Sequence, residues 1–146
     1  MNAVDFLIKE HNKIRKAFAE ISNKVHRDLT KREMFEALSH ELVRHETMEQ
    51  EVWYPKLKTN EKLRDVIKHL VFEEKTAAKA IKEIKKIKIQ EAWEEKFLKL
   101  KKDVEHHATE EETKLFPKVE RLLNEAELNR IGKELREFKL EFEEAR

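Results

Sequence analysis

The sequence of 146 residues contains no cysteine, a single glycine and only two prolines. Without cysteine the chain forms no disulfide and offers no thiolate to a metal, so any metal site must use nitrogen and oxygen donors. Tight turns and strands depend on glycine, Asn-Gly pairs and β-branched runs, and their scarcity predicts an all-α protein. The length suits one modest core, so a single domain over residues 1–146 is expected.

Neither sign of charge dominates, although charged residues make up 43% of the chain. The 32 Lys and Arg residues nearly balance the 31 Asp and Glu residues, and the two signs are interspersed. A nucleic-acid surface needs a basic stripe, so no nucleic-acid partner is expected. The first ten residues carry no basic leader and only a three-residue apolar run. This predicts neither a signal peptide nor a membrane span, and we expect a soluble, cytoplasmic protein.

Apolar residues spaced three and four apart predict five amphipathic helices. Their expected ranges are 3–25, 31–55, 61–86, 91–117 and 125–143, each approximate at its ends. Asn2, Thr30 and Asn60 are the expected N-caps, Thr30 in capping-box spacing with Glu33. Pro55 removes a backbone donor and predicts a kink or an end of the second helix.

The last of these helices has no ionisable residue in its apolar stripe, and we interpret it as a lid or a dimerising helix without chemistry. The single glycine, Gly132, lies in it. A helical Gly costs about 1 kcal/mol relative to Ala, so its presence predicts close packing at this position.

A short motif occurs twice, once in each half of the chain. The two copies align as His45, Glu49, Tyr54 and Pro55 over His107, Glu111, Phe116 and Pro117. In each copy the His and the Glu are four residues apart, so on a helix both side chains share one face. Residues 6–21 also align with residues 69–84 without a gap, which indicates a repeated helical hairpin.

Six polar residues occupy slots of the apolar stripes where Leu or Ile would be expected. They are His11, His45, Glu49, Glu74, His107 and Glu111. The repeat predicts an up-down-up-down four-helix bundle over about residues 3–120, followed by the C-terminal amphipathic helix, and antiparallel neighbours bring the six slots to a common depth. His26, His40 and His106 fall outside the stripes and are expected at the surface.

Burial of three carboxylates favours a metal at these slots. Each unpaired carboxylate taken out of water costs several kcal/mol, whereas a whole domain has only about 5–15 kcal/mol of net stability. The stripes offer no Lys or Arg as a partner, but three imidazoles and three carboxylates suit two divalent ions. The alternative is that the His-Glu pairs are ordinary salt bridges on helix surfaces and the histidines satisfied core residues.

With these motifs the chain resembles the hemerythrin-like proteins with the HHE cation-binding domain. The segments that carry the resemblance are E-H-N-K-I, R-H-E-T-M-E-Q-E-V-W-Y-P and V-E-H-H-A-T-E-E-E-T-K-L-F-P. The resemblance implies two non-heme iron ions with an oxo or hydroxo bridge, and Glu49 and Glu111 as bridging carboxylates. It also implies a small-molecule partner, dioxygen or peroxide, in an oxygen or oxidative-stress response.

The third helix departs from the family pattern, which has a His where this chain has Glu74. We predict Glu74 as the ligand, with His69 as the alternative if the helix slips or rotates. Glu46 and Glu73 are further carboxylates within reach and are left outside the predicted ligand set.

Two functional classes remain open from the sequence. One is a di-iron protein with oxidase-like, peroxidase-like or catalase-like activity; the other is an iron-binding sensor or scaffold bundle without turnover. Ferritin-type sites use Glu-x-x-His, which is absent from this sequence. The oligomeric state is expected to be a monomer or a homodimer.

Overall fold

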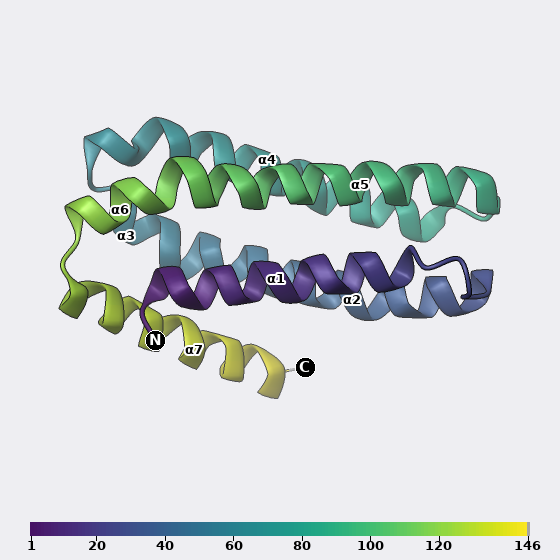
Figure 1. The fold of residues 1–146 in the computed structure, drawn as a ribbon, viewed down its shortest axis with the longest axis horizontal. Helices are drawn as coiled ribbons and strands as arrows, with labels where there is room; N and C mark the ends of the chain where they lie inside the picture. Colours follow the sequence, from purple (N-terminus) through teal and green to yellow (C-terminus); the bar gives the residue numbers. More distant parts are fainter. Residues whose placement is uncertain (146) are drawn as a thin grey trace.

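The computed structural model describes residues 1–145, and the regular elements of this range are all helical, as the composition predicts. The elements are α1 (Ala3–Ile21), α2 (Asp28–Met48), η1 (Glu49–Trp53), α3 (Tyr54–Leu57), α4 (Glu61–Lys86), α5 (Gln90–Glu110), η2 (Glu111–Leu115), α6 (Phe116–Leu122) and α7 (Glu125–Glu144). Figure 1 shows α1 beside α2, α4 beside α5, and α7 packed against α1. None of the described helices combines the length and apolar character that a membrane span requires.

Two of the three expected N-caps are confirmed. The Asn2 side chain accepts a hydrogen bond from the Asp5 N–H, and Asn60 caps α4 in the same way. The prediction for Thr30 is wrong, because α2 already begins at Asp28 after an extended Arg27. An acidic residue in the first turn favours this earlier start through the helix dipole. The first helix is also shorter than expected and ends at Ile21.

Pro55 and Pro117 do not end their helices. Each follows a π-helical turn, η1 or η2, in which one backbone hydrogen bond spans five residues: Tyr54 N–H donates to Glu49, and Phe116 N–H to Glu111. A proline ring in a regular helix clashes with the carbonyl four residues earlier, and the wider turn relieves that clash. The helix therefore continues as α3 after η1 and as α6 after η2. Of the kink or end expected at Pro55, the end is wrong, and the fourth helix runs past its expected limit at Pro117.

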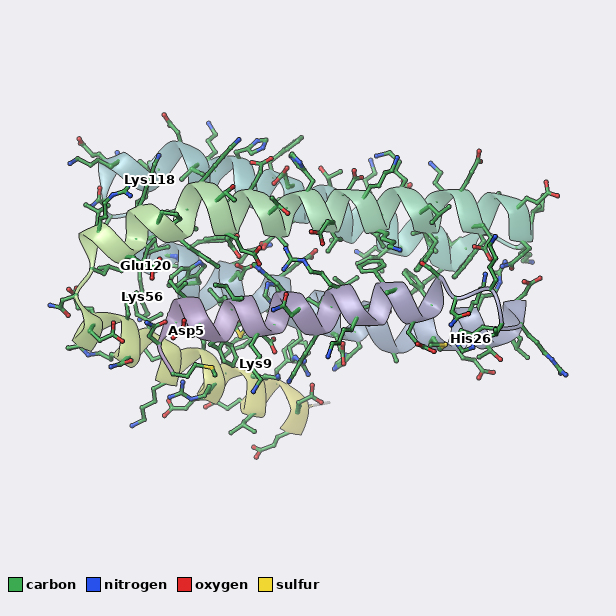
Figure 2. All side chains as sticks on the ribbon, viewed as in Figure 1. Asp5, Lys9, His26, Lys56, Lys118 and Glu120 are labelled. Atoms are coloured by element: carbon green, nitrogen blue, oxygen red, sulfur yellow. The ribbon has the colours of Figure 1, made fainter. Side chains whose placement is uncertain are left out.

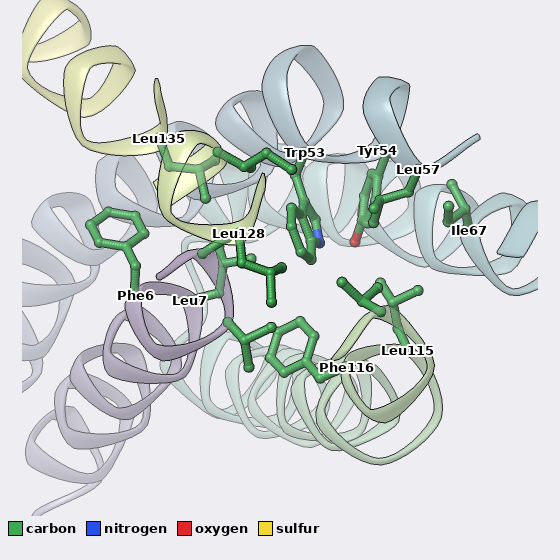
Figure 3. Close-up of a cluster of buried hydrophobic side chains, with 14 of the residues drawn as sticks. Phe6, Leu7, Trp53, Tyr54, Leu57, Ile67, Leu115, Phe116, Leu128 and Leu135 are labelled. Atoms are coloured by element: carbon green, nitrogen blue, oxygen red, sulfur yellow. The ribbon is translucent and has the colours of Figure 1, made fainter. Parts of the chain in front are cut away.

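The core consists of two apolar clusters with a polar layer between them. On α1, His11 lies between Leu7 of the first cluster and Ile14 of the second, and Glu74 on α4 lies between the clusters in the same order. On α2, and on α5 with η2, the second cluster comes first along the chain and the polar residues again lie between the two. Figure 3 shows the first cluster, where side chains of α1, α3, α6 and α7 meet. The two tryptophans lie one in each cluster, with almost no exposed surface. The predicted common depth of the inward polar residues follows from this layering.

Helix α7 packs closely against the start of the chain at Gly132. A Cβ atom added there would lie 2.8 Å from the Met1 carbonyl oxygen and 3.0 Å from the Ala3 nitrogen. Arg136 strengthens the contact by donating a hydrogen bond to the same Met1 oxygen. The close packing predicted from the lone glycine is confirmed.

We predict that Gly132→Ala lowers the free energy of unfolding by about 1–2 kcal/mol. The gain in helix propensity, about 1 kcal/mol, is outweighed by a clash with backbone atoms that have little room to move. Urea denaturation measures the change. Lys133→Ala, at the next and exposed position, is the matched control and should stay within about 0.5 kcal/mol of the parent. A more stable Gly132→Ala protein would contradict the packing.

Candidate metal centre

The polar layer contains two groups of donor atoms that share one carboxylate. His11, His45, Glu49 and Glu111 form the first group, and Glu49, Glu74 and His107 form the second, with the ligand atoms of each group within 4.8 Å of one another. The structure thus brings together all six residues singled out in the sequence. They come from α1, from α2 with η1, from α4, and from α5 with η2.

The distances within the layer are those of atoms that could share an ion. His11 Nε2 lies 3.0 Å from Glu111 Oε1, and His45 Nε2 lies 3.0 Å from Glu49 Oε1. In the second group, His107 Nε2 lies 3.1 Å from Glu74 Oε2 and 3.9 Å from Glu49 Oε1.

Several of these buried atoms have no hydrogen-bond partner in the described part of the chain. They are His11 Nε2, both ring nitrogens of His45, both carboxylate oxygens of Glu49, and Glu111 Oε1. Their mutual approaches lack hydrogen-bond geometry, and unsatisfied buried polar atoms are costly. A cation in the layer would satisfy them, so the residues present fit a metal.

The carboxylates lie close enough to change each other's protonation. Burial raises the pKa of Glu49 to about 7, and the facing Glu111 adds to the rise. Burial and the charge of Glu49 raise the pKa of Glu74 well above its ordinary value. Burial opposes ionisation of Glu111 as well, but contacts with Glu49 and His11 lower its pKa. Without a cation the layer therefore retains protons that a metal would displace.

Tyr54 is a residue of the layer that sequence reasoning did not assign to the site. Its buried hydroxyl donates to Glu111 Oε2 at 2.6 Å and lies 3.3 Å from Glu74 Oε2, so it joins carboxylates of both groups. Gln50 Nε2 donates to the other oxygen of Glu74. The repeat contained a signal for Tyr54. The aligned residue in the other copy of the motif is Phe116, so the hydroxyl group is a polar addition found in one copy and not in the other.

Each histidine of the layer has a second carboxylate behind it. The Nδ1 atoms of the three rings face Glu112 at 2.7 Å from His11, Glu10 at 3.8 Å from His45, and Glu73 at 3.1 Å from His107. Such carboxylates fix the tautomer and orientation of metal-binding imidazoles. Only Glu73 among the three was considered in the sequence, since Glu10 and Glu112 are each one position away from an inward slot.

Two of these outer carboxylates are held by basic side chains. Glu112 accepts a hydrogen bond from each terminal nitrogen of Arg15, and Lys139 of α7 donates a hydrogen bond of 2.8 Å to Glu10. Burial works against ionisation, but the contacts lower the pKa of both carboxyls to about 2. Helix α7 therefore contributes a positive charge near the layer, because Lys139 contacts Glu10, which faces His45.

A mainly apolar cavity of about 270 Å³ opens beside the layer. Its apolar wall includes Ile14, Phe18, Leu42, Ala77 and Val104, and its polar wall includes His11, His45, Glu46, Glu74 and His107. Glu46 does not belong to either donor group but lies at the edge of the cavity. Burial and the charge of Glu74 raise the pKa of Glu46 to about 8.

The remaining histidines lie outside the layer. His69 and His106 are more than half exposed on the outer face of α4 and α5. Figure 2 shows His26 at the end of the molecule where α1 turns into α2. His40 is only 21% exposed and packs on Phe142 of α7, so its expected place in solvent is wrong.

A helical protein with a buried layer of imidazole and carboxylate donors on four helical segments has the design of a cation-binding protein. Comparison with protein families matches residues 2–119 to the hemerythrin HHE cation binding domain. The chain belongs to this family. The match ends before α7, and comparison with curated proteins and with solved structures finds no further relative.

We predict that the metal-free protein loses stability as the pH rises from 5 to 8. Glu46, Glu49, Glu74, His11 and His107 all have pKa values raised above those of the unfolded chain. The folded state therefore binds these protons more tightly than the unfolded chain does. For the carboxyls, the resulting contribution to the free energy of unfolding is complete below about pH 4.5 and is lost as the pH rises through their pKa values in the folded state. The loss should be on the order of a few kcal/mol.

Urea denaturation of chelator-treated protein at several pH values measures this change. Glu46→Gln, which removes the group with a pKa of about 8, should flatten the upper part of the curve. The contributions of Glu10 and Glu112 to stability change only below about pH 4.5, because the pKa values of both carboxyls are lowered. These two residues therefore do not affect the change between pH 5 and 8. Constant or increasing stability between pH 5 and 8 would contradict the prediction.

Proposed function

We propose that this chain binds two iron ions in the polar layer and forms a non-heme di-iron centre that reacts with dioxygen or peroxide. The observation that carries the proposal is the pair of donor groups sharing Glu49, in which several buried donor atoms, including both oxygens of Glu49, have no hydrogen-bond partner in the described chain. The proposed ligands are His11, His45, Glu49 and Glu111 for one ion and Glu49, Glu74, Glu111 and His107 for the other. Membership in a cation-binding family supports the same assignment.

The donor set and its spacing support iron. Imidazole nitrogen and carboxylate oxygen are ligands of non-heme iron, and no thiolate competes in this chain. The Nε2–Oε1 distances of 3.0 Å at His11 and His45 are short enough for both donors of each pair to contact one ion.

The arrangement of the helices supports a finer description of the fold. We propose that α1, α2 with α3, α4, and α5 with α6 form the up-down-up-down bundle of the family in one domain, and that α7 is an addition. The contacts of α1 with α2 and of α4 with α5, together with the short connections, support this topology.

The cavity supports a small-molecule reaction at the centre. Its apolar wall admits dioxygen, and it ends on His11, His45 and His107. Iron, when bound, supplies the electrons for reducing dioxygen or peroxide. Glu46 lines the cavity, and burial raises its pKa to about 8 in the metal-free protein, so it is the side chain that we propose as proton donor to reduced oxygen. Tyr54 keeps its proton and holds Glu74 and Glu111 in place.

Glu74 favours oxidation over oxygen storage. A carboxylate in place of an imidazole adds a negative charge and a harder oxygen donor, both of which stabilise ferric iron. We therefore propose an oxidising, or an oxygen- and peroxide-responsive, centre. A sensor without turnover would show the same iron content but no sustained oxygen consumption by the reduced protein.

We predict two iron ions per chain, and loss of both on Glu49→Ala or Glu111→Ala. Each carboxylate is proposed to contact both ions, so its removal weakens both sites, with iron affinity reduced at least about tenfold. Elemental analysis after anaerobic reconstitution measures the iron. His26→Ala, at the far end of α1, is the control and should keep both ions. A folded wild-type protein without bound metal would refute the proposal.

We also predict that Glu74→His makes oxygen uptake more reversible. Replacing the carboxylate by an imidazole removes the charge that favours ferric iron. Cycles of oxygenation and degassing, followed by absorption spectroscopy, measure how much reduced protein is recovered in the variant and in the parent. Complete recovery of the wild-type protein over repeated cycles would contradict an oxidising centre.

A further inference from the structure

The outer carboxylates of the three histidines differ in what holds them. Arg15 holds Glu112, and Lys139 holds Glu10. Glu73, behind His107, has no Lys or Arg within 4 Å in the described chain; its partners there are the histidines 69, 106 and 107. Beside Glu112 and Glu10 this place is taken by Arg15 and Lys139. Beside Glu73 it is taken by the imidazoles of His69 and His106, which are possible metal ligands.

Two more His-x-x-x-Glu pairs meet at this position. His69 and Glu73 stand four residues apart on α4, and His106 and Glu110 stand four apart on α5. They repeat the spacing of the pairs in the buried layer. On α5 both residues come one position before His107 and Glu111, and on α4 Glu73 comes one position before Glu74. Because successive helical residues are rotated by about 100°, the second set faces the outer side of the α4–α5 pair.

The four side chains converge. His69 Nε2 lies 3.3 Å from Glu110 Oε2 and 3.4 Å from Glu73 Oε2. His106 Nε2 lies 3.6 Å from Glu73 Oε2 and also contacts Glu110 Oε1. The ligand atoms of His69, Glu73 and Glu110 all lie within 4.8 Å of one another.

The three distances of 3.3, 3.4 and 3.6 Å are longer than hydrogen bonds, which mostly lie between about 2.7 and 3.2 Å. The two distances from His69 match the edge of a tetrahedron around a metal, because with bonds of about 2.0–2.1 Å neighbouring ligands lie ~3.3–3.4 Å apart. Glu110 is only 8% exposed, and its nearest Lys or Arg is the exposed Lys114 at 4.0 Å, so its close partners are the imidazoles of His69 and His106.

We propose that His69, Glu73, His106 and Glu110 bind one divalent cation of the zinc class at the surface of α4 and α5, separate from the buried layer. Two imidazole nitrogens and two carboxylate oxygens without a thiolate suit such an ion. The ion joins α4 to α5 and supplies the positive charge that holds Glu73. Through Glu73 Oε1, 3.1 Å from His107 Nδ1, it orients that ring; this last step rests on the proposed role of His107 in the buried centre.

The test uses protein reconstituted with iron and titrated with Zn²⁺ alone, followed by calorimetry and by elemental analysis of both metals. The wild-type protein should bind one Zn²⁺ per chain without losing iron. The double variant His69→Ala/His106→Ala should bind Zn²⁺ at least about tenfold more weakly and keep its iron. His26→Ala, which removes another partly exposed histidine paired with a glutamate, is the matched control and should bind Zn²⁺ like the parent.

Equal Zn²⁺ binding by the double variant and the parent would overturn the proposal, as would the absence of Zn²⁺ binding by the parent. Loss of iron from the double variant would also overturn it, because these histidines would then serve the buried centre. A chain that takes up no iron, yet binds one Zn²⁺ that the double variant does not, would refute the di-iron function and support the surface site.

Discussion

The burial of Glu49, Glu74 and Glu111 between two apolar clusters is the constraint on which the rest of this structure depends. Carboxylates removed from water need compensating charge, and no Lys or Arg of the described chain pairs with these three. Imidazoles, a tyrosine hydroxyl and retained protons supply part of the compensation. Both oxygens of Glu49 still lack a hydrogen-bond partner in the described chain, so the compensation is incomplete. A cation would complete it, and the chain belongs to a family of cation-binding domains.

The π-helical turns show how the backbone adapts to this layer. On an α-helix, residues five apart point about 140° away from each other. The wide turn of η1 brings Glu49 and Tyr54 onto the same inward face, and the proline that follows fits the widened turn. The second half repeats the device around Glu111 and Phe116, so at these two turns the halves differ by the tyrosine hydroxyl. That hydroxyl and the exchange of His11 for Glu74 make the layer asymmetric.

Charge alternates outward from the layer. Imidazoles face the inner carboxylates through Nε2 and the outer carboxylates through Nδ1, and two of the three outer carboxylates meet a Lys or Arg in turn. This order connects the centre with distant parts of the chain. Lys139 links α7, which lies beyond the family match, to His45 through Glu10, and Glu73 links the exposed face of α4 and α5 to His107.

The sequence by itself determined the helical class, most helix boundaries and the six inward residues, because apolar periodicity and a repeated motif depend only on spacing along the chain. It did not reveal the continuation of the helices through Pro55 and Pro117, because a π-turn is decided by packing around the proline. Nor did it reveal Glu10, Glu112 or Tyr54 as neighbours of the layer. Their roles depend on contacts between helices far apart in sequence, and only the tertiary structure brings those helices together.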